Sequence, residues 1–187
     1  KVVDKIIKKS NHKFEFIDLG GGMGISYQKN NKKLNYKKYN IAIKKFLKNH
    51  KSKIIFEPGR SIVGNIGSLI TKVIYIKEND KKNFIILDAA MNDLMRPALY
   101  GANHRTLPVT KTSQTSKKTY EFVGPICEST DKFLKLKKFS QVYEGDYVAI
   151  ADVGAYGMSL TSNYNTRPIV AEVLINRSKH KLIKKRQ

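Results

Sequence analysis

Residues 14–26 read Phe14-Glu-Phe-Ile-Asp-Leu-Gly-Gly-Gly-Met-Gly-Ile-Ser26, an apolar run that ends in three consecutive glycines. The apolar residues predict a short buried strand. Gly20, Gly21 and Gly22 lack Cβ atoms, so the backbone after the strand can turn tightly and direct several N–H groups at one anion. A strand that runs into such a loop is a common phosphate-binding arrangement in α/β proteins.

A second apolar run, residues 54–56, ends in the sequence Glu57-Pro-Gly-Arg60. This motif places a carboxylate, a rigid turn and a guanidinium at the end of a strand. Helical spacing of apolar residues predicts helices over 1–10 and 36–50. Helix, strand, loop, helix, strand is the order of parallel β/α units, in which residues at the strand ends face a ligand. The two loops together favour a phosphorylated ligand that also carries a basic atom.

The pattern changes after a short helix expected over 61–67. Short apolar runs separated by turn residues predict a sandwich or barrel of strands. We expect these strands over 69–76, 84–88, 120–123, 133–136, 147–151 and 169–175. Residues 111–118, rich in Ser, Thr and Lys, predict an exposed loop. The sequence therefore predicts an α/β part over residues 1–66 and an all-β domain over 67–187.

The composition is typical of a water-soluble protein with 41% hydrophobic residues, and no apolar run approaches the ~18 residues of a membrane span. No signal peptide is apparent, and the chain starts without Met inside a helical pattern, which predicts a fragment. Cys127 is the single cysteine, so an internal disulfide is excluded and a reducing, cytoplasmic compartment is expected. The four histidines lack metal-ligand spacing.

The formal net charge is +21, which often indicates nucleic-acid binding. Here 30 of the 36 basic residues are lysines scattered along the chain, without interleaved aromatic residues. We interpret this charge as a compositional bias of solvated surfaces and expect no nucleic-acid partner. In such a lysine-rich chain, each arginine is expected where a planar, forked cation is required.

The glycine loop is also similar to a motif of another enzyme class. Residues 18–24, Asp-Leu-Gly-Gly-Gly-Met-Gly, are similar to the first motif of S-adenosylmethionine methyltransferases. Such sites need an acidic residue some twenty positions later to bind ribose hydroxyls. Between Leu19 and Phe56 the chain has ten lysines and no acidic residue, which counts against that class. A Walker loop is excluded because no Gly-Lys-Ser/Thr follows. A further interpretation of the glycine loop is a simple tight turn at a strand–helix junction, without a ligand.

Three further motifs combine polar or reactive side chains with turn-forming residues. Arg96 and Tyr100 lie four positions apart beside a proline, and Cys127 and Glu128 lie in the polar segment 124–131. Tyr156 lies between small residues in Asp-Val-Gly-Ala-Tyr-Gly-Met. Each motif has a structural alternative: an anchored loop, a cysteine that fills the core, or the start of a helix.

These motifs, in this order, resemble the alanine-racemase-like, pyridoxal-phosphate-dependent decarboxylases, and among them the group that acts on diaminopimelate. The resemblance implies the last β/α units of a (β/α)8 barrel, of the triosephosphate isomerase (TIM) type, followed by a β-rich C-terminal domain, in a homodimer. It implies pyridoxal 5′-phosphate as the cofactor and conversion of meso-diaminopimelate to L-lysine and CO₂. The alternatives are a sister decarboxylase of another basic amino acid and a basic, non-catalytic binding module. Ornithine decarboxylases usually have Asp after the cysteine, where this chain has Glu128.

The resemblance also implies a role for each motif. The cofactor would be bound by the glycine loop, by the strand-end motif and by Tyr156, that is by Gly20, Gly21, Gly22, Glu57, Pro58, Gly59, Arg60 and Tyr156. Substrate would be held by Arg60, Arg96, Tyr100, Glu128 and Tyr156, and Cys127 would return a proton to the substrate. The lysine that holds the cofactor covalently lies, in that family, in the first half of the barrel. No lysine here matches its motif, so we expect this chain to be inactive alone.

Overall fold

The computed structural model describes residues 2–27, 34–110 and 114–187, and the chain forms two compact units, Lys1–Ile62 and Val63–Gln187. The boundary expected from the sequence falls after residue 66. Residues on both sides of that point are hydrogen-bonded to the segment 153–154 of the second unit, since Gly154 N–H donates to Gly64 O (3.0 Å) and Val153 N–H donates to Gly67 O (3.0 Å). The stretch 63–67 therefore belongs structurally with the second unit.

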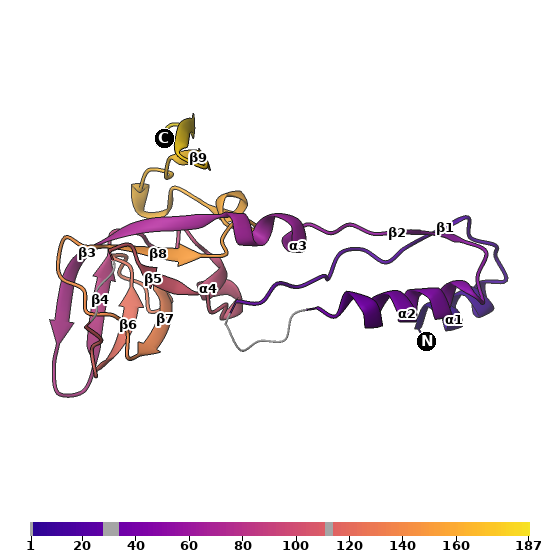
Figure 1. Cartoon of the computed structure of the whole chain (residues 1–187), viewed down its shortest axis with the longest axis horizontal. Helices are drawn as coiled ribbons and strands as arrows, with labels where there is room; N and C mark the ends of the chain where they lie inside the picture. The colour runs from indigo at the N-terminus through magenta and orange to yellow at the C-terminus, as the bar shows by residue number, and fades with distance from the viewer. Residues whose placement is uncertain (1, 28–33, 111–113) are drawn as a thin grey trace. The chain divides into compact units, whose positions relative to one another are not determined.

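The first unit is a β/α unit preceded by a helix (Figure 1). Its elements are α1 (Val2–Ser10), β1 (Phe16–Asp18), α2 (Tyr36–Leu47), β2 (Lys53–Ile55) and the start of α3 (Arg60–Val63). Strands β1 and β2 pair in parallel, with Ile17 opposite Ile54. The parallel β/α order expected from the sequence is thus present, with shorter strands than expected.

Helix α2 begins at an Asn35 cap, whose side chain accepts a hydrogen bond from Lys38 N–H (3.0 Å), as capping asparagines commonly do. It ends at Leu47, whereas the sequence predicts a helix to residue 50. His50 turns away from the helix to bond Asp4 of α1, with 2.7 Å between Nε2 and Oδ1, and its ring packs on Phe46. The contact with Phe46, four residues earlier, explains why position 50 fits the helical pattern although the helix has already ended.

The second unit is built on one six-stranded sheet with the order β5-β8-β3-β4-β6-β7. All neighbours are antiparallel except β4 and β6. The strands are β3 (Ser68–Glu78), β4 (Asn83–Leu87), β5 (Thr106–Pro108), β6 (Thr119–Val123), β7 (Lys132–Lys137) and β8 (Tyr147–Ala151). The long β3 organises the sheet, because it pairs with β8 along its first half and with β4 along its second half.

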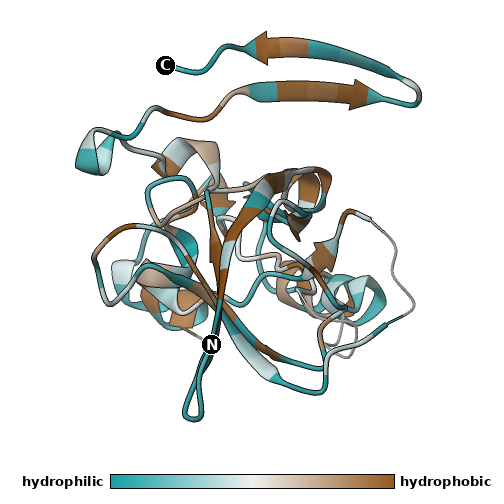
Figure 2. Cartoon of the chain, turned by 90° about the vertical axis from the view of Figure 1, so that its left-hand side faces the viewer, coloured by the Kyte–Doolittle hydropathy of each residue, from teal (hydrophilic) through white to brown (hydrophobic). Residues whose placement is uncertain are grey.

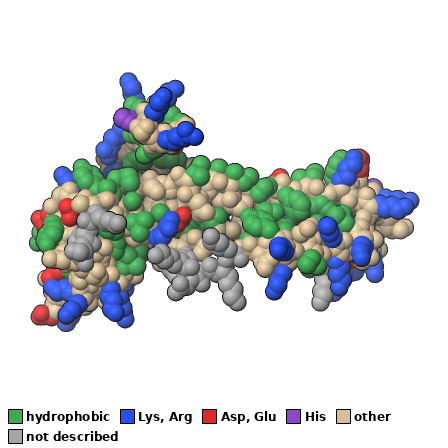
Figure 3. All heavy atoms as spheres, viewed as in Figure 1, with side chains coloured by type: hydrophobic (Ala, Val, Ile, Leu, Met, Phe, Trp, Pro, Cys, Tyr) green, Lys and Arg blue, Asp and Glu red, His purple; other side chains and the backbone are tan. Residues whose placement is uncertain are grey.

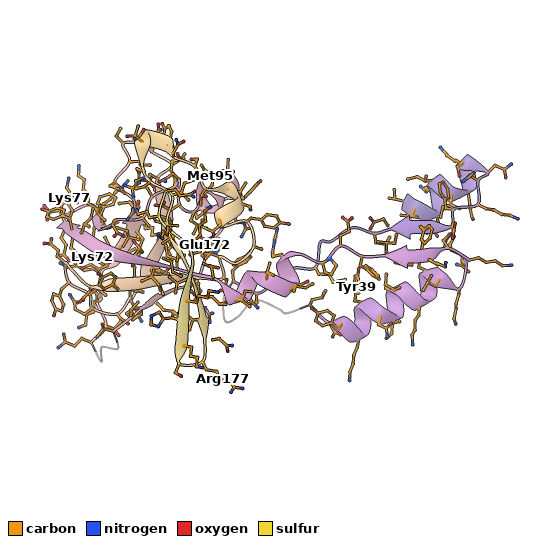
Figure 4. All side chains as sticks on the ribbon, turned by 90° about the horizontal axis from the view of Figure 1, so that it is seen from above. Tyr39, Lys72, Lys77, Met95, Glu172 and Arg177 are labelled. Atoms are coloured by element: carbon orange, nitrogen blue, oxygen red, sulfur yellow. The ribbon has the colours of Figure 1, made fainter. Side chains whose placement is uncertain are left out.

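The remaining elements of this unit are short. They are η1 (Gly64–Ile66), α4 (Arg96–Tyr100), η2 (Met158–Leu160), η3 (Tyr164–Thr166), β9 (Glu172–Asn176) and β10 (Lys179–Lys184). Strands β9 and β10 form a separate hairpin, which stands apart from the six-stranded sheet in Figure 2. Figure 4 shows Glu172 at its base and Arg177 at its turn.

Two strands differ from the sequence expectation, which missed β5 and β10. Strand β5 contains Pro108, which weakens a strand prediction, and β10 is mostly lysine and histidine with only two apolar residues. Strand β5 lies at the edge of its sheet and β10 belongs to a two-stranded hairpin. Strands in such positions can pair with few apolar residues. Of the expected loop over 111–118, residues 111–113 lie outside the described residues, and Thr115 forms an isolated bridge with Ser140.

The core of the second unit lies on one face of the six-stranded sheet. Phe122 is fully buried, and its ring meets the edge of Phe139 with the centroids 4.9 Å apart. The alternation of buried and partly exposed residues in β6 follows the two-residue period of a strand with one covered face. The other buried apolar residues of this cluster are Val73, Ile85, Leu87, Ala89, Leu94, Tyr120, Phe133, Val142, Val148 and Ile150.

Gly154 gives a stability test of the packing between residues 63–67 and 153–154. A Cβ at position 154 would lie 1.9 Å from Val63 O, so Gly154→Ala forces two backbone segments apart. We expect the free energy of unfolding, measured with urea, to fall by at least about 2 kcal/mol. Gly24→Ala is the control, because a Cβ there meets nothing within 4 Å. Equal unfolding midpoints for the two variants would contradict this account.

Candidate active site

The glycine loop and the Glu57 motif lie side by side in the first unit. Because β1 and β2 are parallel and adjacent, the loops that follow them leave the same edge of the sheet. Leu19 N–H donates to Ile55 O (3.0 Å), and Glu57 N–H donates to Gly20 O (2.9 Å). The structure thus joins two motifs that are more than thirty residues apart in the sequence.

The three glycines of the loop each have a structural requirement. Gly20 and Gly22 adopt φ of +64° and +74°, which residues with a Cβ rarely adopt. A Cβ on Gly21 would lie 2.6 Å from Glu57 O, so only glycine permits this approach of the two loops. Asp18 fixes the entry to the loop by accepting a hydrogen bond from Gly20 N–H (2.7 Å). Such a glycine backbone suits an anion that is bound by N–H groups.

The turn after Glu57 leads directly into α3, which begins at Arg60. Ile62 N–H donates to Gly59 O (3.0 Å) and closes the first turn of this helix. At Gly59 a Cβ would meet no atom within 4 Å, so the packing of the described residues does not require glycine there. The sequence suggests that a ligand comes close to this motif, and such a ligand would explain the glycine at position 59.

The second unit contains a buried cluster around Arg96, at the start of α4. Only 5% of Arg96 is exposed, and its guanidinium carbon lies 6.0 Å from the centre of the Tyr156 ring. Its Nη1 lies 3.4 Å from His104 Nε2, and His104 Nδ1 lies 3.2 Å from Ala151 O. A neutral histidine with its proton on Nδ1 satisfies both contacts, donating to the carbonyl and accepting from arginine.

Burial lowers the pKa of His104, and the positive charge of Arg96 acts in the same direction. The hydrogen bond to Ala151 O opposes this shift, since it stabilises the protonated ring. The neutral form assigned to His104 agrees with the direction of the pKa shift. The sequence gives no local signal for this histidine, which lies four residues after Tyr100, the last residue named in the Arg96 motif.

Tyr156 and Tyr100 differ in their surroundings. Tyr156 has φ +59° and its ring is half-exposed beside Arg96, whereas Tyr100 is 68% exposed at the end of α4. The small residues around Tyr156 serve backbone packing: a Cβ on Gly157 would lie 2.4 Å from Val153 O. Position 156 is therefore a tight turn and not the start of an α-helix.

The segment with Cys127 and Glu128 is held by a buried carboxylate. Asp131, 2% exposed, accepts hydrogen bonds from Ile126 N–H (2.8 Å) and from Met91 N–H (2.7 Å). Desolvation raises the pKa of Asp131, although both backbone N–H groups oppose this. The Cys127 thiol itself is exposed. A thiol in a polar, accessible loop fits chemistry better than core packing.

Glu128 and Arg167 form contacts that no local sequence pattern indicates. Glu128 Oε1 accepts a hydrogen bond from the Tyr164 hydroxyl (2.6 Å). Arg167 donates through Nε to Asn92 Oδ1 (3.1 Å), donates to Asp88 O, and lies 3.6 Å from Asp93 Oδ2. The expectation that arginines occupy positions needing a forked cation is the one signal that could have selected Arg167.

Other site classes receive no support from the described residues. Within 2–27, 34–110 and 114–187, no group of three His, Cys, Asp or Glu side chains could hold a metal ion. No described helix is long and apolar enough to cross a membrane. Lysine and arginine side chains are spread over the visible face of each unit in Figure 3 and do not form one patch.

Comparison with curated proteins gives matches across most of the chain. The diaminopimelate decarboxylase of Aquifex aeolicus is 44% identical over 173 residues, which are 92% of this chain and 41% of that protein. The diaminopimelate decarboxylase of Vibrio cholerae is 41% identical over 187 residues, which are 100% of this chain and 44% of that protein. The chain thus spans less than half the length of these relatives.

Solved structures agree with these matches. Diaminopimelate decarboxylase from Helicobacter pylori complexed with L-lysine has a TM-score of 0.85 and 41% identity, covering 100% of this chain and 45% of that one. Lysine/ornithine decarboxylase from Vibrio vulnificus has a TM-score of 0.72 at 18% identity, covering 88% of this chain and 44% of that one, which shows a shared fold.

The family model "Pyridoxal-dependent decarboxylase, C-terminal sheet domain" matches residues 2–154, which include both loops of the first unit, Arg96 and the Cys127–Glu128 segment. The six-stranded sheet of the second unit agrees with this description. The chain belongs to the pyridoxal-dependent decarboxylase family.

Proposed function

We propose that this chain is the C-terminal part of a decarboxylase that converts meso-2,6-diaminopimelate to L-lysine and CO₂ in the cytoplasm, with pyridoxal 5′-phosphate as its cofactor. The observation that carries the proposal is the contact between the glycine loop and the Glu57 motif at neighbouring parallel strand ends. The matched diaminopimelate decarboxylases, 41–46% identical, support this substrate over lysine or ornithine, the amino acids named for a sister decarboxylase at 18% identity.

The residues of the first unit fit the cofactor. Of the glycine loop Gly20, Gly21 and Gly22, the last two would bind its phosphate through backbone N–H groups, while Gly20, whose N–H donates to Asp18, would shape the loop. Arg60 would add a cation to the phosphate or to substrate. Glu57 would pair with the pyridine nitrogen and keep it protonated, while Pro58 and Gly59 form the turn between these two charges. The bound cofactor supplies an electron sink when CO₂ leaves.

The residues of the second unit fit an amino-acid substrate with charged groups at both ends. Arg96, held by His104 and Tyr156, would bind a carboxylate, and Tyr100 would contribute a hydroxyl. Glu128 would bind the distal ammonium group. Cys127 would donate a proton to the substrate carbon that loses CO₂, a role suited to an exposed thiol. Tyr156 would contact both cofactor and substrate.

We propose further that residues 1–66 form the last β/α units of a (β/α)8 barrel, and residues 67–187 the β domain that follows it. The lysine that holds the cofactor would lie in the earlier part of that barrel. Two such chains would form a homodimer, with Cys127 of one subunit reaching the cofactor of the other. No nucleic acid or membrane takes part in this proposal.

The first test of this function uses the 187-residue chain alone. We expect no CO₂ release from meso-diaminopimelate, because the cofactor-binding lysine is not among its residues. The measurement is ¹⁴CO₂ release with added pyridoxal phosphate, and the complete enzyme is the positive control. Turnover by the purified chain would show that the assignment of the missing lysine is wrong.

The second test changes Glu57 in the complete enzyme. Glu57→Gln keeps the shape of the side chain but removes the charge that holds the pyridine nitrogen protonated. We expect kcat to fall at least about tenfold while the cofactor still binds, since the interaction strengthens as negative charge develops. Glu15→Gln, also in the first unit and 74% exposed at its side chain, is the matched control. An unchanged kcat in Glu57→Gln would leave Glu57 with a structural role only.

The third test concerns the shared site. Cys127→Ala and a substitution of the cofactor-binding lysine should each be nearly inactive alone. After subunit exchange, random association gives about half heterodimers, each with one intact site, so about a quarter of wild-type activity should return. If activity stays at the separate levels after exchange has been verified, Cys127 serves the site of its own chain or none.

A further inference from the structure

The segment that follows the family match, residues 162–167, is fixed to the turn after β4. Ser162 N–H donates to Asn92 O (3.1 Å), and Asn92 Nδ2 donates back to Ser162 O (3.0 Å). Arg167, at the other end of the segment, donates to Asn92 Oδ1 (3.1 Å). Asn92 is fully buried, so both ends of the segment are tied to one side chain in the interior.

The backbone inside this segment is strained. Asn165 and Thr166 adopt φ of +55° and +56°, two consecutive left-handed residues that are not glycine. Such conformations are unfavourable and persist where the surrounding structure determines them, often beside functional sites. The residue that this turn presents is Tyr164, which directly precedes the left-handed pair.

The Tyr164 hydroxyl donates to Glu128 Oε1 at 2.6 Å, a short distance typical of a hydrogen bond to a charged acceptor. This bond raises the pKa of Tyr164, and the negative charge of Glu128 acts in the same direction. Tyr164 therefore contacts the residue that directly follows Cys127 in the chain.

We propose that Tyr164 is a positioning residue that holds the Glu128 carboxylate in the orientation needed for the distal ammonium group of the substrate. The inference rests on the proposed function, in which Glu128 binds that group. Glutamate has three rotatable side-chain bonds, and an exposed glutamate is not held in one conformation. With Oε1 engaged by Tyr164, Oε2 is the oxygen that we assign to the ammonium group.

Arg167 anchors Tyr164 through the backbone, since Arg167 N–H donates to Tyr164 O (3.3 Å). Its contacts with Asn92, Asp88 O and Asp93 fix the C-terminal end of the strained turn. Asp93 is 5% exposed, so this ion pair is largely removed from water and weakly screened. The position of the tyrosine is thus set by buried groups, although the tyrosine itself is 44% exposed.

The experiment uses Tyr164→Phe in the complete enzyme, which removes one oxygen atom from a half-exposed side chain. Binding of L-lysine, the product, is compared by calorimetry with binding of 6-aminohexanoate, which lacks the α-ammonium group. Because the carbon that loses CO₂ becomes Cε of lysine, the α-ammonium group of lysine is the one distal to the reacting carbon. We expect lysine binding to weaken about tenfold, and 6-aminohexanoate binding to stay unchanged, since only lysine uses Glu128. KM for meso-diaminopimelate should rise by a similar factor, with kcat changed less than KM.

Matched variants separate this inference from the proposed function. Tyr143→Phe, at an exposed tyrosine of the same unit, should leave both affinities unchanged. Glu128→Gln should weaken lysine binding, and adding Tyr164→Phe to it should have no further effect, because the two residues act as one unit.

Three results would overturn the inference. If Glu128→Gln weakens lysine binding and Tyr164→Phe does not, Tyr164 has no positioning role while the function stands. If Tyr164→Phe weakens the binding of lysine and of 6-aminohexanoate equally, the role of Tyr164 is structural. If Glu128→Gln leaves lysine binding unchanged, the role proposed for Glu128 is wrong, and the inference fails with it.

Discussion

The carboxylate of Asp131 is the group on which the functional face of the sheet domain depends. It is buried, and it accepts backbone hydrogen bonds from two loops that are far apart in the sequence, at Met91 and at Ile126. A buried carboxylate without such donors would be strongly unfavourable, so both loops are held where their N–H groups meet it. A Cβ at Gly124 would lie 2.3 Å from its oxygen, which explains the glycine.

The same principle extends through the neighbouring polar groups. Asp93 caps its own turn by accepting from Ala90 N–H (2.8 Å), and Arg167 lies beside it. Desolvation raises the pKa of Asp93, and both the Ala90 N–H and the arginine oppose that shift. Buried polar groups that are fully satisfied define one arrangement of loops, because alternative arrangements leave a charge without a partner. The loops that carry Arg96, Glu128 and Tyr164 are connected through this network.

In the first unit the corresponding constraint is the parallel pairing of β1 and β2. The pairing itself involves three residues on each strand, yet it brings the glycine loop against Glu57. Gly21 makes this contact sterically feasible, since any side chain there would meet Glu57 O. The exposed apolar residues of this unit, such as Val2, Phe16 and Ile41, show that its own burial is slight. The site geometry here comes from backbone contacts more than from a hydrophobic core.

The sequence by itself determined the parallel β/α order, most strands of the β domain and the family, because periodicity, glycine runs and short motifs are local properties of the chain. It also indicated Arg96, Cys127 and Glu128 as candidate site residues, because each lies beside turn-forming residues in its motif. Only the tertiary structure decided that His104 contacts Arg96, that Asp131 holds the loop of Cys127, and that Tyr164 bonds Glu128. The physical reason is that Tyr164 and Glu128 lie 36 positions apart in the chain, while the other two contacts, at separations of 8 and 5 positions, form between buried groups. Which of these groups meet is set by burial and tertiary packing, which no local pattern encodes.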